Sequence, residues 1–236
     1  MRSLIVMAMF TASLAHAGWS DYEEIRNLEL DADGISQLTI NAGAGSMDVT
    51  GVKGLDKINV KATIVVPGKD EDKAVRVIEK RIQLSLEVRA GTAELEAWFD
   101  SGLMSFGSSP YIVLEVSVPQ GMAVNIDDGS GSIDVVDLAG DLTIDDGSGS
   151  IDIRNVADVR IDDGSGSIDL VDVAGDVSVV DGSGSISIRH VQGSVTIDDG
   201  SGSIEVTDID SDLIIVDDGS GGLRFTDIRG TVDADT

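Results

Sequence analysis

Pairs of aspartates recur before the glycines of a repeated turn in the second half of the chain. The stretch IDDGSGSID begins at Ile126 and returns at Ile144 and Ile161. Its repetition creates two files of carboxylates, a glycine-adjacent file directly before the first glycine of each turn and a preceding file one residue earlier. The glycine-adjacent file is Asp128, Asp146, Asp163, Asp181, Asp199 and Asp218, and the preceding file is Asp127, Asp145, Asp162, Asp198 and Asp217.

Both files could bind cations if the repeats stack. Carboxylates about 5 Å apart repel unless turn amides, water or cations offset their charge. Calcium prefers several carboxylate and carbonyl oxygens, so the eleven aspartates are candidates for a calcium ladder. The calcium-binding β-roll motif is G-G-x-G-x-D-x-U-x, but Ile133 stands where that motif has its aspartate. Two interpretations therefore stay open, the ladder and simple capping of the turns by short polar side chains.

No other chemistry is well supported by the residues present. The chain has no cysteine, and His190 is the only histidine beyond residues 1–17, so zinc sites and Ser–His–Asp catalysis lack their usual groups. His190 occupies a position that the other repeats fill with Asp or Asn, which favours a polar role at a corner of the coil. The equivalent residues are Asp137, Asn155, Asp172, Asp208 and Asp227. The repeats vary little in length and leave no loop to shape a pocket. We expect no catalytic residues and no enzyme, with a polysaccharide-active enzyme as the less favoured alternative.

The elements that position these residues follow from the repeat. The first glycines of the turns are Gly129, Gly147, Gly164, Gly182, Gly200 and Gly219, at steps of 18, 17, 18, 18 and 19 residues. Within a repeat, Leu142 and Ile144 alternate with polar residues, as do Ile151 and Ile153, which predicts two short strands with one face inward. The equivalent inward residues of the last repeat are predicted to be Ile214, Val216, Leu223 and Phe225.

Stacking of these repeats predicts an all-β protein, a parallel β-solenoid (β-helix) of about 18 residues per coil and two strands per coil. An antiparallel meander is the alternative, because both turns of a repeat could close a hairpin. We assign residues 124–236 to the solenoid array. Residues 18–123 are assigned to a strand-rich N-terminal cap, with a helix near 69–82 and a flexible loop over 100–110.

The N-terminus indicates export. Residues 1–17 combine Arg2, an apolar run and an Ala-His-Ala ending, the pattern of a cleavable signal peptide. We therefore expect a periplasmic or secreted protein that does not insert into the membrane after signal removal. A net charge of −27 argues against nucleic-acid binding. A monomer is expected, without a cofactor unless calcium binds.

The chain resembles a family of exported bacterial proteins described as "putative adhesins" of unknown function, related to head-GIN-like β-solenoids. The resemblance rests on LTINAGAGSMDVTGV from Leu38, on the insert that carries the helix, on LEVSVPQGMAVNIDDGSGSIDV from Leu114, and on the recurring turn-to-strand phrase. It implies an envelope β-solenoid and brings no catalytic residues. The resulting hypothesis is a non-enzymatic structural or interaction module at the cell envelope, with an envelope or extracellular protein or glycan as partner. A calcium-binding β-roll-like module is the alternative.

Overall fold

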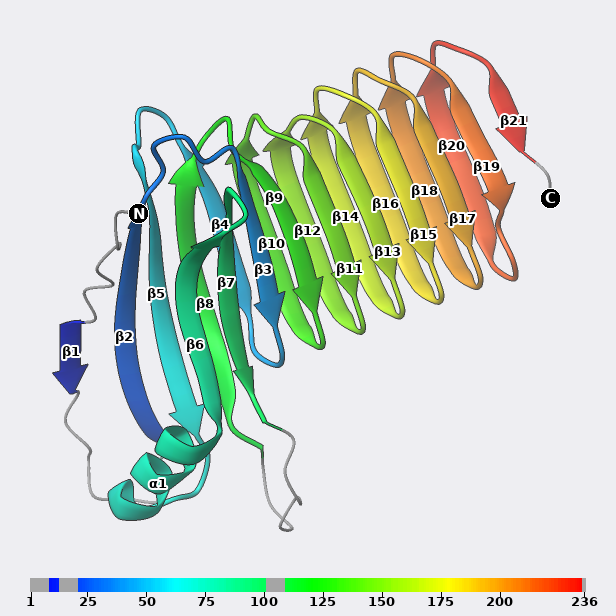
Figure 1. The fold of residues 1–236 in the computed structure, drawn as a ribbon. Helices are drawn as coiled ribbons and strands as arrows, with labels where there is room; N and C mark the ends of the chain where they lie inside the picture. The colour runs from blue at the N-terminus through cyan, green and yellow to red at the C-terminus, as the bar shows by residue number, and fades with distance from the viewer. Residues whose placement is uncertain (1–8, 13–20, 101–108, 235–236) are drawn as a thin grey trace.

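The computed structural model describes residues 9–12, 21–100 and 109–234 and arranges them in two long β-sheets. One sheet, here sheet A, has the strand order β1-β2-β5-β8-β4-β10-β12-β14-β16-β18-β20. The other, sheet B, has the order β21-β19-β17-β15-β13-β11-β9-β3-β7-β6. Figure 1 shows the coils stacked side by side in a long row that leads away from the N-terminal end. The predicted parallel β-solenoid, of about six turns, is confirmed.

Each coil of the array contributes one strand to each sheet. The sheet B strands are β9 (Ala123–Asp128), β11 (Leu142–Asp146), β13 (Val159–Asp163), β15 (Val177–Asp181), β17 (Val195–Asp199), β19 (Leu213–Asp217) and β21 (Val232–Ala234). The sheet A strands are β10 (Gly131–Leu138), β12 (Gly149–Val156), β14 (Gly166–Val173), β16 (Gly184–Val191), β18 (Gly202–Ile209) and β20 (Gly222–Ile228). Neighbouring strands of the array are parallel within each sheet, and equivalent residues such as Ile133 and Ile151 are paired. The meander is therefore excluded for the array.

The core is built from the same five inward positions in successive coils. In one coil these are Leu142, Ile144, Ile151, Ile153 and Val156, each at most 3% exposed. No single coil could enclose these side chains, so each coil depends on its neighbours to cover them. Full burial of one such side chain stabilises the fold by roughly 1.5–3 kcal/mol.

The last coil departs from the predicted alternation. Its buried residues in sheet B are Leu213 and Ile215, whereas Ile214 is 40% and Val216 51% exposed, so the predicted inward pair is wrong. The physical reason is a bulge. The step to Gly219 is one residue longer than the regular step, and the register against β17 shifts between Ile215 and Asp217.

In sheet A, the predicted inward positions of the last coil are only partly enclosed. Leu223 is partly buried against the core, and Phe225 is 41% exposed. Their strand, β20, has a partner on one side only, β18. These side chains therefore lack the following coil that covers their counterparts elsewhere in the array.

The solenoid begins earlier in the chain than the array does. Strands β3 (Gln37–Ala42) and β4 (Met47–Val52) form a coil that pairs in parallel with β9 and β10. On its other side this coil pairs in parallel with β7 (Thr92–Phe99) and β8 (Tyr111–Pro119), which come later in the chain. The coil of residues 37–52 is thus enclosed between two later segments.

The outer end of the cap is antiparallel and carries the helix. Strands β2 (Tyr22–Asp31) and β5 (Lys57–Val66) extend sheet A, and β6 (Ile82–Arg89) extends sheet B by pairing with β7. Helix α1 (Glu71–Arg81) begins after Asp70, whose Oδ1 accepts a hydrogen bond of 3.0 Å from the Lys73 N–H. The helix buries Ala74 and Ile78, as its apolar spacing predicts.

Two predicted segments are described only in part. Strand β1 (Met9–Ala12) lies inside the predicted signal peptide and pairs antiparallel with β2. The other residues of 1–17, and most of the predicted loop over 100–110, lie outside the described residues. One core cluster runs from the cap strands through the array, and both sheets are shared by cap and array. Among the described residues, no helix is both long and apolar enough to span a membrane.

Candidate functional site

The two aspartate files lie on opposite faces of sheet B. Because side chains alternate along a strand, Asp145 and Asp146 cannot point the same way. Asp146 lies on the face of Leu142 and Ile144 and is 2% exposed, whereas Asp145 faces solvent. The structure therefore separates the eleven predicted ligands into an inward and an outward set, and stacks each set from coil to coil.

Five members of the glycine-adjacent file form what we call the buried aspartate file. They are between 0% and 4% exposed: Asp128, Asp146, Asp163, Asp181 and Asp199. The sixth member, Asp218, follows the bulge of the last coil and is only partly buried, while Asp217 takes the place opposite Asp198.

The turn that follows the aspartate supplies a hydrogen bond to three members of the file. The N–H of Ser165 donates to Asp163 Oδ1 at 3.2 Å, and the equivalent serines in the next two coils donate to Asp181 and Asp199 at 3.1 and 3.0 Å. Turn capping, one of the two sequence interpretations, is thus present. The carboxylate oxygen Oδ2 is buried without a hydrogen-bond partner in all five aspartates, and in Asp146 the same holds for Oδ1.

Burial dominates the acidity of this file. Burial raises the pKa of Asp128 to about 7, and repulsion from Asp146 adds to the rise. Burial likewise raises the pKa of Asp146 and that of Asp181 to about 6. The pKa values of Asp163 and Asp199 are also raised by burial, while their turn amides oppose the rise.

The calcium ladder has no preformed cage. Among residues 21–100 and 109–234, no three or more His, Cys, Asp or Glu side chains come together in a group that could hold a metal ion. The preceding file presents carboxylates to solvent and is interrupted by Val180, and the buried file presents unpartnered carboxylate oxygens among aliphatic side chains. Calcium commonly takes six to eight oxygen ligands, more than either file offers at one point.

His190 lies at a corner where the backbone turns through the left-handed region. Its φ is 57°, and the other five members of its file have φ between 54° and 61°. Asp and Asn tolerate this conformation better than most residues, which explains the composition of the file. The imidazole Nδ1 lies 3.1 Å from Asp172 Oδ1, and Nε2 lies 3.8 Å from Asp208 Oδ2. The ring is thus an exposed bridge between adjacent coils.

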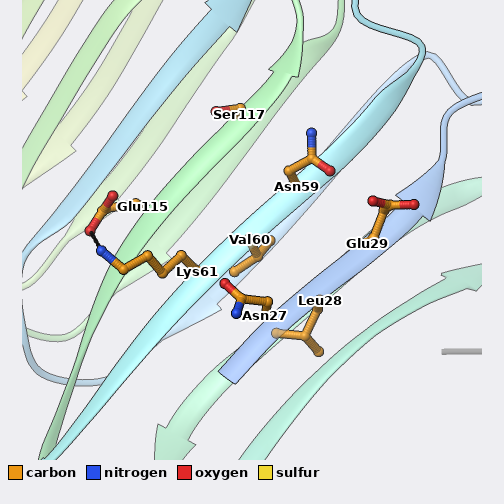
Figure 2. Close-up of a pocket in the computed structure, with 8 residues that line it drawn as sticks. All are labelled: Asn27, Leu28, Glu29, Asn59, Val60, Lys61, Glu115 and Ser117. Atoms are coloured by element: carbon orange, nitrogen blue, oxygen red, sulfur yellow. Dashed lines mark hydrogen bonds and ion pairs between the residues drawn. The ribbon is translucent and has the colours of Figure 1, made fainter. Parts of the chain in front are cut away.

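The cap carries an open groove that the sequence analysis missed. It encloses about 530 Å³ on the outward face of β2, β5 and β8. Its lining is polar apart from Leu28 and Val60: Asn27, Glu29, Asn59, Lys61, Glu115 and Ser117. Figure 2 shows Lys61 reaching Glu115 of the neighbouring strand, where Nζ and Oε1 lie 2.5 Å apart. The signal that could have found it was the polar alternation along 57–66 and 111–119, which marks an outward face.

This groove is one end of an extended surface on sheet A. Directly paired residues form a row of outward side chains that runs across ten strands, which we call the acidic row. Its members in spatial order are Asn27, Lys61, Glu115, Asp48, Asp134, Asp152, Asp169, Ser187, Glu205 and Arg224. The pKa of Asp134 is raised, first by burial and then by repulsion from the charges of Asp152 and Asp48.

The aromatic residues of the cap do not form a common platform. Trp98 and Phe99 alternate on opposite faces of β7, and Phe99 packs against the core. The Trp98 Nε1–H donates to Glu96 Oε2 at 2.8 Å, on the outward face. Phe99 therefore contributes to the core of the cap, whereas Trp98 lies on the opposite face.

Comparison with known proteins gives structural likeness only. No protein-family model matches the sequence, and no curated protein matches it. A "putative lipid binding protein" from Parabacteroides distasonis covers 90% of this chain and 94% of its own, at 13% identity and a TM-score of 0.47. A "putative cell adhesion protein" from Clostridium sporogenes covers 91% and 98%, at 14% identity and a TM-score of 0.34.

A third solved structure, a "putative adhesin" from Bacteroides fragilis, covers 89% of this chain and 97% of its own, at 13% identity and a TM-score of 0.37. At these identities and TM-scores, the function of this chain must be argued from its own residues.

Proposed function

We propose that the protein is an exported, non-enzymatic, adhesin-like interaction module that binds an envelope or extracellular partner through the outward face of sheet A. The observation that carries this proposal is the acidic row. It places five carboxylates, from Glu115 to Asp169, on adjacent strands of one hydrogen-bonded sheet, and Glu205 two strands further along, so their spacing is fixed before any partner arrives. A rigid surface loses little conformational entropy on binding.

The neighbouring row on the same face has a different character. It begins with one carboxylate, continues with amide and hydroxyl groups in the cap and alternating aliphatic and arginine side chains in the array, and ends with two threonines. Its members in spatial order are Glu29, Asn59, Ser117, Thr50, Val136, Arg154, Val171, Arg189, Thr207 and Thr226. One of these arginines, Arg189, already pairs with Asp169 of the acidic row at 2.9 Å. The face therefore offers hydrogen-bonding and charged groups in parallel lines, which suits an extended partner with positive charge along its length.

The arrangement of the described residues gives no support to catalysis. The open groove of the cap contains the Lys61–Glu115 ion pair, the carboxylate of Glu29, which pairs with Lys57, and neutral polar side chains. His190 stands on another part of the surface. Repeated weak contacts along one long face are the mode of binding that these rows favour, because each added contact becomes intramolecular once the first has formed.

The test compares two variants with the same change in charge. In the face variant, Asp48→Asn, Asp134→Asn and Asp152→Asn remove three neighbouring charges from sheet A. In the matched control, Asp127→Asn, Asp145→Asn and Asp162→Asn remove three neighbouring charges from the outward face of sheet B. Binding of each purified chain to polylysine, to isolated cell-wall sacculi and to envelope vesicles is measured at two salt concentrations.

We expect the face variant to lose at least about tenfold in affinity while the control stays near wild type, with circular dichroism unchanged in both. Equal losses would show that the charge of the whole protein, and not this face, governs binding. Export is tested separately by fractionation of the full-length chain and N-terminal sequencing, with a mature start at Gly18 as the expected result.

A further inference from the structure

The proposed surface makes no use of the buried aspartate file, which lies on the inward side of sheet B. Its five carboxylates stack from coil to coil, and each has a buried Oδ2 without a partner, while Asp146 also has an unpartnered Oδ1. Burial of an ionised carboxylate without a partner costs far more free energy than burial of a neutral carboxyl group, and five such charges in a column also repel one another. The file therefore needs a positive ligand, either a metal cation or a proton on the carboxylate itself.

The surroundings of the file favour the proton. The charged groups that act most strongly on it are other carboxylates: its own members, Asp127, Asp145, Asp162 and Asp198 on the same strands, and Asp217 and Asp218 in the last coil. The facing sheet A strands contribute aliphatic side chains such as Ile151 and Ile153 to the same interior. A cation there would have to exchange its hydration shell for isolated Oδ2 atoms.

We propose that the buried aspartate file is a stack of neutral carboxylic acids, which takes up protons when the coils assemble and makes the array more stable as its surroundings become mildly acidic. In Asp163, Asp181 and Asp199 the carboxyl group then keeps its turn hydrogen bond through Oδ1, and no member of the file carries charge into the core. For an exported chain, this protonation couples the stability of the solenoid to external pH.

The direction of the pH dependence follows from the acidity of the file. Because the folded pKa values lie above the ordinary value of 3.8, the folded state binds more protons than the unfolded state between about pH 4 and pH 7. Stability contributed by the file is complete below the unfolded pKa and is lost as the pH rises through the folded values.

The experiment uses asparagine, which keeps the shape and the Oδ1 acceptor but cannot ionise. The buried variant is Asp146→Asn with Asp181→Asn, and the matched control is Asp145→Asn with Asp198→Asn on the outward face. Thermal unfolding of both and of wild type is followed from pH 5 to pH 8, with calcium and with chelator. The control corrects for the general relief of repulsion in so acidic a chain.

We expect the wild-type and control midpoints to fall as the pH rises, and the buried variant to fall less, so that it exceeds the control by at least about 5 °C at pH 8. An equal pH response in the two variants would overturn the proposal. So would a calcium-dependent rise of the wild-type midpoint at pH 8 that the buried variant lacks, because the file would then be a cation site. If the buried variant does not fold, infrared spectroscopy of the wild type at pH 6 provides the test. We expect the carbonyl band of protonated carboxyl groups, and its absence would refute the stack of acids.

Discussion

Gly149 and Gly131 lie so close in adjacent coils that a Cβ atom at Gly149 would stand 1.6 Å from the carbonyl oxygen of Gly131. The φ of Gly149 is +154°, a backbone conformation that favours glycine. The same contact recurs at Gly166 and Gly184, at 1.5 and 1.6 Å. The second glycine of each GSGS turn is therefore required by the stacking of the coils, because any side chain there would push two backbones apart.

Replacement of Gly149 by alanine should destabilise the array strongly. The added methyl group meets backbone that cannot move without opening the ladder, so we expect a loss of at least about 2 kcal/mol in the free energy of unfolding. Gly121→Ala is the control, because nothing lies within 4 Å of its Cβ position. Urea denaturation measures both, and a loss below about 0.5 kcal/mol for Gly149→Ala would contradict the close stacking.

His190 should accept asparagine but not valine. Its φ of 57° is tolerated by Asn and disfavoured for a β-branched residue. We expect His190→Asn to stay within about 0.5 kcal/mol of wild type, and His190→Val to lose about 1–2 kcal/mol in denaturant unfolding. Equal losses would mean that the imidazole bridge between Asp172 and Asp208 stabilises the coil more than its backbone conformation does.

The repeat made the architecture of the array predictable. Alternation placed Ile151 and Ile153 inward, and the recurring glycines marked the corners, because identical coils must stack like on like. The same alternation implies that Asp145 and Asp146 face opposite ways, a consequence that the predicted calcium ladder overlooked. Burial of one of them, and the pKa shift that follows, depends on three-dimensional packing and could not be known from composition.

Irregular features were harder to predict for physical reasons. Counting back from Gly219 gave the wrong inward residues, because one inserted residue can be absorbed at several points of a strand and only packing chooses the bulge. The acidic row could not be assembled from sequence, since Asp48 and Glu115 become neighbours through a stacking order that differs from chain order.

The bulge in the last coil can be tested by single truncations. Ile215 is 1% exposed and Ile214 is 40% exposed. We expect Ile215→Ala to cost about 2–4 kcal/mol in the free energy of unfolding, and Ile214→Ala less than about 1 kcal/mol. Local hydrogen exchange of the last coil provides the measurement if that coil unfolds by itself. The reverse order of effects would restore the alternation predicted from the sequence.

The enclosed position of residues 37–52 can be tested by a disulfide, because the chain has no cysteine of its own. Thr50 of β4 and Val136 of β10 are directly paired on the outward face of sheet A, and paired strands place Cα atoms within the range that a disulfide spans. The double substitution Thr50→Cys with Val136→Cys should therefore form an intramolecular disulfide on mild oxidation, seen as a gel-mobility shift that reductant removes. The control, Thr50→Cys with Arg154→Cys, places the thiols two strands apart, at about twice the strand spacing, and should stay reduced. A disulfide in the control but not in the test pair would show that β4 does not lie beside β10.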